Sequence, residues 1–259
     1  MRSRQYPMLL LLFLSALLSQ NVLAQQNLES KIRLADEVDA VDPRVSVGST
    51  FDKQYITSVL GGESSVLDYK NGWFQIPAWF AGSWTSTNTS STYRRNEITG
   101  VVDNEARLYN TKNGGEWGHM RDSFGNVWHV YGHKFWSISK SADYDRYSFK
   151  SNIEPVYVTE KAVILKAGGV DIKVDKANKV ISVTPFQQIS QYKPVRDGVI
   201  RAKKLFRAYD PGGKAAFSTS ELEVYQRSKP FIEFRPDNKL DVEMKSHLDK
   251  FLRAQEKKL

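Results

Sequence analysis

The chain has 259 residues, of which 41% are hydrophobic, 25% charged and 12% aromatic, and its net charge is +8. This composition excludes a disordered tail and a collagen-like fibre, and the length predicts one main domain. The absence of cysteine excludes disulfides, Cys-ligated zinc, iron–sulfur clusters and thiol nucleophiles.

Residues 1–24 have the pattern of a secretory signal peptide. Arg2 and Arg4 precede an apolar run from Met8 to Leu18, and Val22-Leu23-Ala24 has the small-residue pattern of a leader-peptidase site. The apolar run is about 11 residues long, whereas a membrane span needs about 20. We therefore expect cleavage after Ala24 and a secreted or periplasmic mature chain.

Residues 25–72 contain scattered turn residues and predict an N-terminal lead-in, with one short helix near residues 28–38. From Trp73 onward, short runs of β-branched and aromatic residues alternate with turn residues. The predicted strands are 92–102, 116–121, 127–136, 147–150, 162–167, 170–174, 180–186, 199–209 and 215–225. The predicted turns are 113–115, 123–126, 168–169, 175–178, 197–198 and 210–213.

Sequential antiparallel strands with short connections form a meander, and a long meander tends to close because open sheet edges invite unwanted pairing. The predicted fold class is therefore all-β, with a meander that closes into a β-barrel over residues 73–236. Residues 237–259 predict a C-terminal amphipathic helix. Asp237 or Asn238 would cap this helix, and its apolar stripe would pack on the outside of the sheet.

Positive charge is concentrated in the C-terminal third. Residues 25–186 contain 19 basic and 19 acidic side chains, whereas residues 187–259 contain 16 basic and 10 acidic ones. The basic residues include Arg201, Lys203, Lys204, Arg207, Lys257 and Lys258. We expect a solvated face here and leave open a contact with an anionic surface, while a secreted location argues against nucleic acid as a partner.

All six tryptophans and three of the four histidines lie between residues 73 and 136. Such aromatic rings suit either a barrel core or the wall of a site for a flat apolar molecule. The candidate ligand-binding residues are Trp117, His119, Trp128, His129, Tyr131 and His133.

We expect no metal centre and no cofactor. His129 and His133 would be about 13 Å apart on one strand and cannot share an ion. The pair His119 and His129 across a hairpin remains the alternative. We find no nucleophile elbow and no phosphate-binding loop, and Asp143, Asp145 and Glu116 are unassigned candidates for acid–base chemistry.

The segment from Trp79 to Trp84 resembles the Gly-x-Trp opening of lipocalins and related calycin barrels, through Gly82 and Trp84. In that family the tryptophan closes one end of the barrel. Asp143 and Tyr144 are similar to the family's Thr-Asp-Tyr segment, with Ala142 in place of the threonine. The resemblance implies that Arg227 packs over Trp84. Residues 172–181 and 217–231 resemble uncharacterised lipocalin-like proteins of cyanobacterial envelopes and plastid lumens, which implies a thylakoid-lumen location in a photosynthetic source.

The expected function is the binding of a small apolar or aromatic molecule, such as a lipid or pigment, and we favour a protein that is not an enzyme. This hypothesis predicts a deep, hollow interior. One alternative is a secreted hydrolase of carbohydrates or esters, with an open cleft where Glu116, His119, His133 or Asp143 converge. Another is an envelope scaffold with a filled core. A fold alone does not decide among them.

Overall fold

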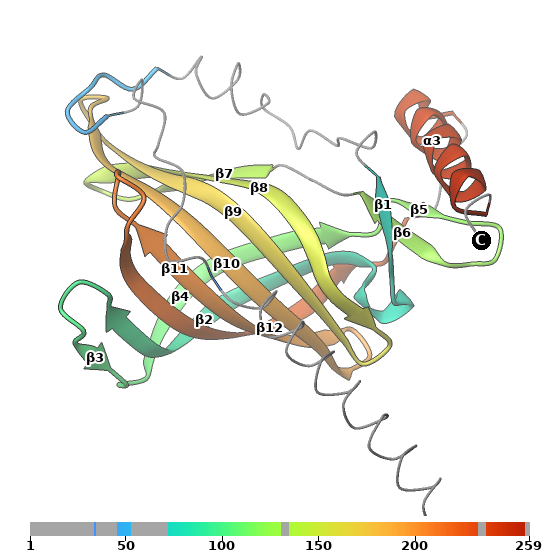
Figure 1. The fold of residues 1–259 in the computed structure, drawn as a ribbon, viewed down its shortest axis with the longest axis horizontal. Coiled ribbons are helices and arrows are strands. Elements are labelled where there is room, and N and C mark those ends of the chain that lie inside the picture. The colour runs from blue at the N-terminus through green and yellow to red at the C-terminus, as the bar shows by residue number, and fades with distance from the viewer. Residues whose placement is uncertain (1–33, 35–45, 53–71, 131–134, 233–236, 257–259) are drawn as a thin grey trace, which may run out of the picture. The chain divides into compact units, whose positions relative to one another are not determined.

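The computed structural model describes residues 34, 46–52, 72–130, 135–232 and 237–256 (Figure 1). The predicted signal peptide, the basic pair Lys257-Lys258 and all of the predicted helix 28–38 except Leu34 lie outside these residues. The described part is an antiparallel β structure with one helix near the C-terminus, and this coarse part of the predicted fold class is confirmed.

The elements follow one another along the chain as a long series of strands that ends in a helix. They are β1 (Trp73–Ile76), a 3-10 helix (Ala78–Phe80), β2 (Gly82–Asn96), β3 (Val102–Asp103), β4 (Arg107–Trp117), β5 (Met120–Arg121), β6 (Val127–Val130), β7 (Phe135–Lys140), β8 (Tyr144–Thr159), β9 (Ala162–Asp175), β10 (Val180–Arg196), β11 (Val199–Tyr209), β12 (Ala215–Lys229) and α3 (Lys239–Glu256).

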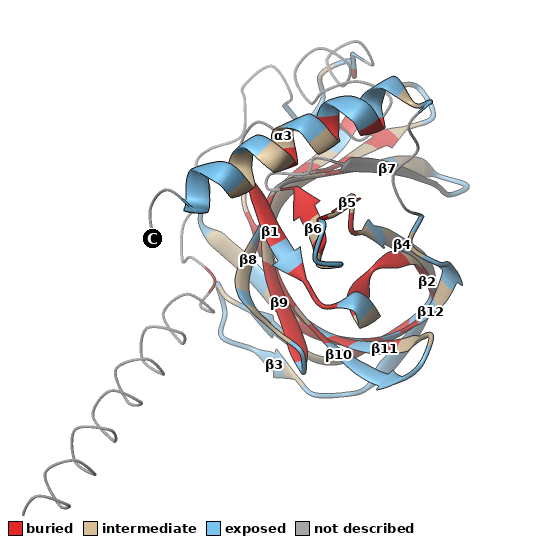
Figure 2. Ribbon diagram, turned by 90° about the vertical axis from the view of Figure 1, so that its right-hand side faces the viewer, coloured by how far each residue is buried: buried red, intermediate tan, exposed pale blue. Residues whose placement is uncertain are grey.

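Nine strands form one large sheet, in which β7 to β12 follow each other as a meander. The sheet then continues from β12 to β2, and β2 pairs with both β3 and β4. Figure 2 shows the curvature of this sheet in a view from its end, and Figure 1 shows the smaller sheet of β1, β6 and β5 at that end. Among the described residues the pairing ends at β3 and β4 on one side and at β7 on the other, so the predicted closed barrel is not seen.

Two predicted turns are wrong, because the glycines there lie inside strands. Residues 113–115 belong to β4, and Gly168-Gly169 lies in the middle of β9, which runs through both of the strands predicted there. A Cβ atom at Gly169 would lie 2.6 Å from the Phe186 ring and closer still to the Phe149 carbonyl oxygen. Glycine here allows close packing rather than a reversal of the chain. The predicted turns at 123–126, 175–178, 197–198 and 210–213 are confirmed.

The large sheet has two faces, which we name by what they carry. The inner face carries Trp84, Ile200 and Glu223, and near Trp84 it packs into a core with residues of β1 and β6. The outer face is the opposite side. Along β8 to β10 it carries a second core, in which Phe51 of the lead-in packs on Tyr147 with ring centroids 4.6 Å apart.

Helix α3 begins where the sequence predicts. The Asn238 side chain accepts hydrogen bonds from the backbone N–H groups of Leu240 at 3.0 Å and Asp241 at 3.4 Å, as an N-cap does. Met244 and Leu248 are buried against Trp73, Met120 and Val130. The helix therefore packs on the small sheet, and the predicted position outside the barrel sheet is corrected.

Gly82 lies where β2 meets the end of β12, and it cannot be replaced without strain. Its φ is +118°, and a Cβ atom there would lie 2.7 Å from the backbone oxygen of Lys229. We predict that Gly82→Ala lowers the free energy of unfolding by roughly 2 to 4 kcal/mol, because backbone strain and a clash add together. Urea unfolding monitored by tryptophan fluorescence measures the change.

Gly100→Ala is the matched control. Gly100 also has a positive φ, +71°, but its Cβ would meet nothing within 4 Å. This variant should lose only about 1 kcal/mol. Equal losses in the two variants would show that the approach of Lys229 to Gly82 is unimportant.

Candidate functional site

The predicted aromatic wall is a packed core. Trp117, at the end of β4, stacks on Phe80 with ring centroids 5.0 Å apart, and it lies 5.0 Å from His129 and 5.9 Å from Tyr192. His129 is fully buried. These rings pack against one another at the end of the inner face, beside the small sheet.

His119 and His129 form a stacked pair, with ring centroids 4.3 Å apart and planes 18° apart. The Nδ1 atom of His119 accepts the backbone N–H of Val130, and that of His129 accepts the N–H of Gly118, both at 3.2 Å. In the neutral rings these bonds place the proton on Nε2. Within the described part of the chain, no three His, Asp or Glu side chains gather as a metal site would require.

Trp128 faces away from this pair. Its Nε1 atom donates to the Asp122 carboxylate at 3.0 Å, and its ring meets the edge of Phe251 in α3 at 6.0 Å. The structure thus brings Trp117, His119 and His129 together and places Trp128 on the other side of β6. Tyr131 and His133 lie outside the described residues.

The Gly82-x-Trp84 segment lies at one end of the large sheet, at the start of β2. Trp84 is buried, and its Nε1 atom donates to the carbonyl oxygen of Phe80 at 2.9 Å. The Arg227 guanidinium lies 4.8 Å above the Trp84 ring and donates to the carbonyl oxygen of Trp79 at 3.0 Å. This is the cation–π contact that the resemblance implies.

Asp143 and Tyr144 lie at the other end of the large sheet. Tyr144 is paired with Asp175, the last residue of β9. The core around Trp84 packs near the opposite end of β9, which begins at Ala162. The Tyr144 ring packs under Lys173, whose Nζ lies 4.9 Å from the ring centroid, and Asp143 is exposed.

The described residues that were considered for hydrolysis do not converge, and His133 lies outside the described part of the chain. Glu116 is exposed opposite Ser83 at the Trp84 end, and His119 is packed in the aromatic core. Asp143 is exposed at the far end, and the neighbouring Asp145 pairs with Lys176 at 2.7 Å.

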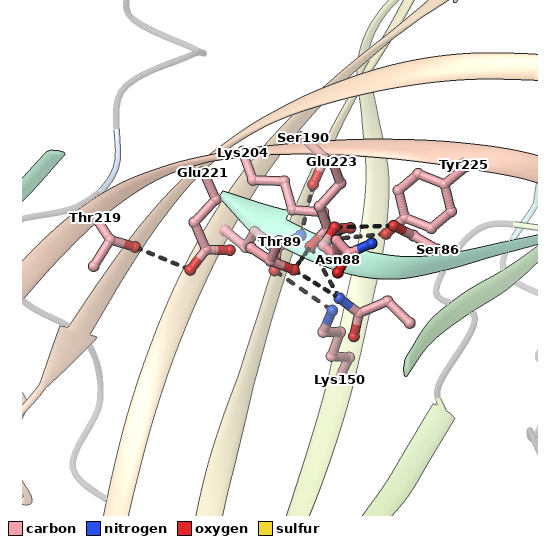
Figure 3. Close-up of polar contacts among 12 residues, drawn as sticks. Ser86, Asn88, Thr89, Lys150, Ser190, Lys204, Thr219, Glu221, Glu223 and Tyr225 are labelled. Carbon is pink, nitrogen blue, oxygen red and sulfur yellow. Dashed lines mark hydrogen bonds and ion pairs between the residues drawn. The ribbon is translucent and has the colours of Figure 1, made fainter. Parts of the chain in front are cut away.

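Sequence reasoning missed a buried polar cluster on the inner face, centred on Glu223 (Figure 3). One carboxylate oxygen of Glu223 accepts from Lys204 Nζ at 2.6 Å. The other accepts from Thr89 Oγ1 at 2.9 Å and Asn113 Nδ2 at 3.0 Å. The side chains of Lys204 and Glu223 are only 8% and 1% exposed. Lys204 also donates to the Tyr225 hydroxyl at 2.9 Å, so the cluster links β2, β4, β11 and β12.

Further polar side chains surround this cluster on the same face. Gln188 donates to Ser190 Oγ at 2.6 Å and accepts from Lys150 Nζ at 3.4 Å. Ser91 is paired with Glu221 in the register and is 3% exposed, and its Oγ has no hydrogen-bond partner among the described residues. A buried hydroxyl without a partner costs free energy, so Ser91 is a position where a ligand atom would be favourable.

An aromatic row borders the polar groups. Phe186 stacks on Phe206 with centroids 5.2 Å apart, and Phe206 lies 6.0 Å from Phe217. All three residues are on the inner side by register, since Phe186 and Phe217 both pair with Ala208. A polar cluster and an apolar row therefore adjoin on one surface.

The ionisable groups of this face are perturbed by burial and by one another. Burial lowers the pKa of Lys150 to about 8, with the positive charge of Lys204 adding to the effect. Burial raises the pKa of Glu221. Burial also acts to raise the pKa of Glu223, but the charge and hydrogen bonds of its neighbours, Lys204 above all, outweigh it and hold this pKa below its usual value.

A surface cavity of about 420 Å³ lies elsewhere, on the outer side near the turn after β9. Its polar groups are already engaged, with Lys176 on Asp145 and the Asn178 amide donating to the carbonyl oxygen of Phe51 at 2.8 Å. We therefore place the candidate site on the inner face.

Comparison with family models, curated proteins and solved structures finds no match to this chain. In the described part of the chain, no helix is long and apolar enough to cross a membrane.

We predict that Glu223→Gln lowers the free energy of unfolding by about 3 to 5 kcal/mol, because it leaves Lys204 buried without a counter-charge. The double variant Glu223→Gln/Lys204→Met removes both charges and should recover most of this loss. Chemical denaturation of the wild type and both variants measures the coupling. A double variant no more stable than Glu223→Gln alone would contradict the ion pair.

The same pair predicts a dependence of stability on pH. Because the pKa of Glu223 is lowered in the folded protein, its contribution is present above the pKa of an unfolded glutamate and is lost as pH falls through the lowered value. Glu223→Gln should therefore lose less stability than the wild type over this acidic range. Parallel curves of unfolding free energy against pH would refute the assignment.

Proposed function

We propose that this protein binds a small apolar or aromatic molecule against the inner face of its large sheet. The observation that carries the proposal is a change in packing along that face. Near Trp84 the inner side chains, such as Val163, Ile200 and Ala202, are fully buried. Further along the same face Lys150, Gln188 and Phe206 are half-buried, so part of each side chain stays accessible, whereas Phe186 and Ser190 beside them are buried.

The chemistry of this surface fits a ligand with an apolar body and a polar group. The partly exposed rings of Phe206 and Phe217, packed against the buried Phe186, offer flat apolar contact area. The Ser91 hydroxyl offers a hydrogen bond in a buried setting. Neighbouring polar and apolar groups orient a bound molecule, because each end has one favourable position.

The proposal includes a lipocalin-like barrel in a secreted, periplasmic or, in a photosynthetic source, thylakoid-lumen protein. The meander of β7 to β12, the Gly82-x-Trp84 segment and the Arg227 contact support the barrel. The leader pattern of residues 1–24 supports the location.

The two alternatives have less support. A hydrolase needs a carboxylate or histidine that reaches its substrate, but Glu223 is 1% exposed and its carboxylate already accepts several hydrogen bonds. The described candidates Glu116, His119 and Asp143 lie apart. A scaffold with a filled core does not account for half-buried Lys150, Gln188 and Phe206 on the inner face.

The first experiment identifies the cargo. Protein purified from its native host is denatured, and the extract is analysed by mass spectrometry for small molecules. We expect an apolar compound at stoichiometric amount, which would name the ligand.

A substitution that fills the inner face should block binding. We predict that Gln188→Trp weakens binding of the neutral fluorescent probe N-phenyl-1-naphthylamine at least tenfold, or by about 1.4 kcal/mol, because the indole occupies the surface beside Phe186 and Lys150. Fluorescence titration of purified protein measures the dissociation constant.

Gln191→Trp is the matched control. Gln191 is half-buried on the same strand, but it pairs with Lys203 and faces outward. This variant should bind the probe as the wild type does. Equal loss in both variants, or a wild type that does not bind, would refute a site on the inner face.

A further inference from the structure

The outer face of β11 and β12 carries an exposed row of apolar and basic side chains. Arg201, Lys203 and Leu205 of β11 are exposed on this side. Opposite them on β12 lie Val224, paired with Arg201 and 55% exposed, and Leu222, paired with Lys203 and 37% exposed. Apolar and cationic groups are thus next to each other along two adjacent strands.

This arrangement reverses the usual pattern of a sheet that has one face in water. In such a strand the apolar residues face the core and the polar residues face solvent. In β12 the acidic residues Glu221 and Glu223 face inward, while Leu222 and Val224 face outward. The exposed leucine and valine therefore lie on a surface that the core does not explain.

The outward side chains of these two strands carry only positive charge, although the Glu97 carboxylate reaches one edge of the surface, where it pairs with Arg207 at 3.7 Å and accepts from Ser218 at 2.6 Å. The outward positions of the two strands are 199, 201, 203, 205 and 207 on β11 and 218, 220, 222, 224 and 226 on β12, and none of them is acidic. Lys193 of β10, which pairs with Arg201, adds a third exposed cation. No described carboxylate forms an ion pair with Lys193, Arg201 or Lys203.

The surface continues across the neighbouring strands. Leu222 pairs with Ser90 of β2, and Ser90 pairs with Leu108 of β4, which is 72% exposed. The outer face from β10 to β4 therefore presents three cations and four exposed aliphatic side chains, Leu205, Leu222, Val224 and Leu108. We name these seven residues the outer patch.

We propose that the outer patch docks on an anionic lipid surface. The cations would lie at the phosphate level of the headgroups, and the aliphatic side chains between them would enter the boundary with the acyl chains. A soluble polyanion would be held by the cations alone and would leave the aliphatic side chains in water. Docking is independent of the inner-face site, although it would place a binding protein beside a source of apolar molecules.

Vesicle sedimentation tests this proposal with the processed protein, its N-terminus confirmed by mass spectrometry so that no apolar leader remains. We expect binding to phosphatidylcholine vesicles that contain phosphatidylglycerol and little binding to phosphatidylcholine alone. Each basic side chain near an anionic surface strengthens binding about fivefold. Loss of two basic side chains in Arg201→Glu/Lys203→Glu should therefore weaken vesicle binding about 25-fold, and the repulsion of the new carboxylates should weaken it further.

Lys250→Glu/Arg253→Glu is the matched control, because it makes the same charge change at exposed positions on α3. This variant should keep most of the vesicle binding. Equal losses in the two double variants would show that net charge alone attracts the protein, and this would overturn a specific outer patch. Equal binding to neutral and anionic vesicles would overturn it as well.

A second pair of substitutions tests the aliphatic part. Leu222→Ser/Val224→Ser should weaken vesicle binding severalfold while leaving retention on a heparin column unchanged, because only a lipid surface uses these side chains. Unchanged vesicle binding would overturn the lipid assignment and favour a polyanion. Probe binding at the inner face should survive in all these variants, which separates failure of docking from failure of the proposed function.

Discussion

The carboxylate of Glu223 is the constraint on which the arrangement of the sheet depends. It is buried, and it receives a cation from β11, a hydroxyl from β2 and an amide from β4. Removing charges from water costs several kcal/mol per ion, so each of these partners must be in place. A slip of one strand by one residue would turn a partner to the other face and leave the charge uncompensated. We infer that the cluster fixes the register between strands far apart in the sequence.

The pairing of β2 with β12 shows why such a constraint is needed. The meander of β7 to β12 forms from neighbours in the chain, whereas β2 must find a strand more than a hundred residues away. Loop closure over that distance is unfavourable, and several bulges interrupt this pairing. Two buried side-chain contacts help to hold it: Trp84 beneath Arg227 near the end of the pair, and Thr89 on Glu223 in the middle. Gly82 allows the closest approach at the end of the pair.

Local signals in the sequence predicted the elements that depend on local physics. Turns with Asp and Gly, such as Asp197-Gly198, and the Asn238 cap of α3 lie where the sequence predicted them. Gly168-Gly169 was misassigned because the same residue type also permits close packing inside a strand, and only the position of Phe186 distinguishes the two uses. Trp117 and His129 are residue types that occur both in the walls of ligand sites and in packed cores. Only their contacts in the structure show which of the two they form.

The inner-face cluster could not be predicted in the same way, because alternation gives the two faces of a strand but not which face is inside. In β12 the sequence Glu221-Leu222-Glu223-Val224 suggests buried aliphatic residues and exposed acids, and the structure has the opposite. The one local sign is Lys204, which interrupts the otherwise apolar inner series Ile200, Ala202, Phe206 and Ala208 of β11. A lysine in that series requires a buried acid, and the adjacent strand supplies one only if Glu223 faces inward. The requirement then forces Leu222 and Val224 outward, so one buried ion pair accounts for both the polar inner face and the apolar outer patch.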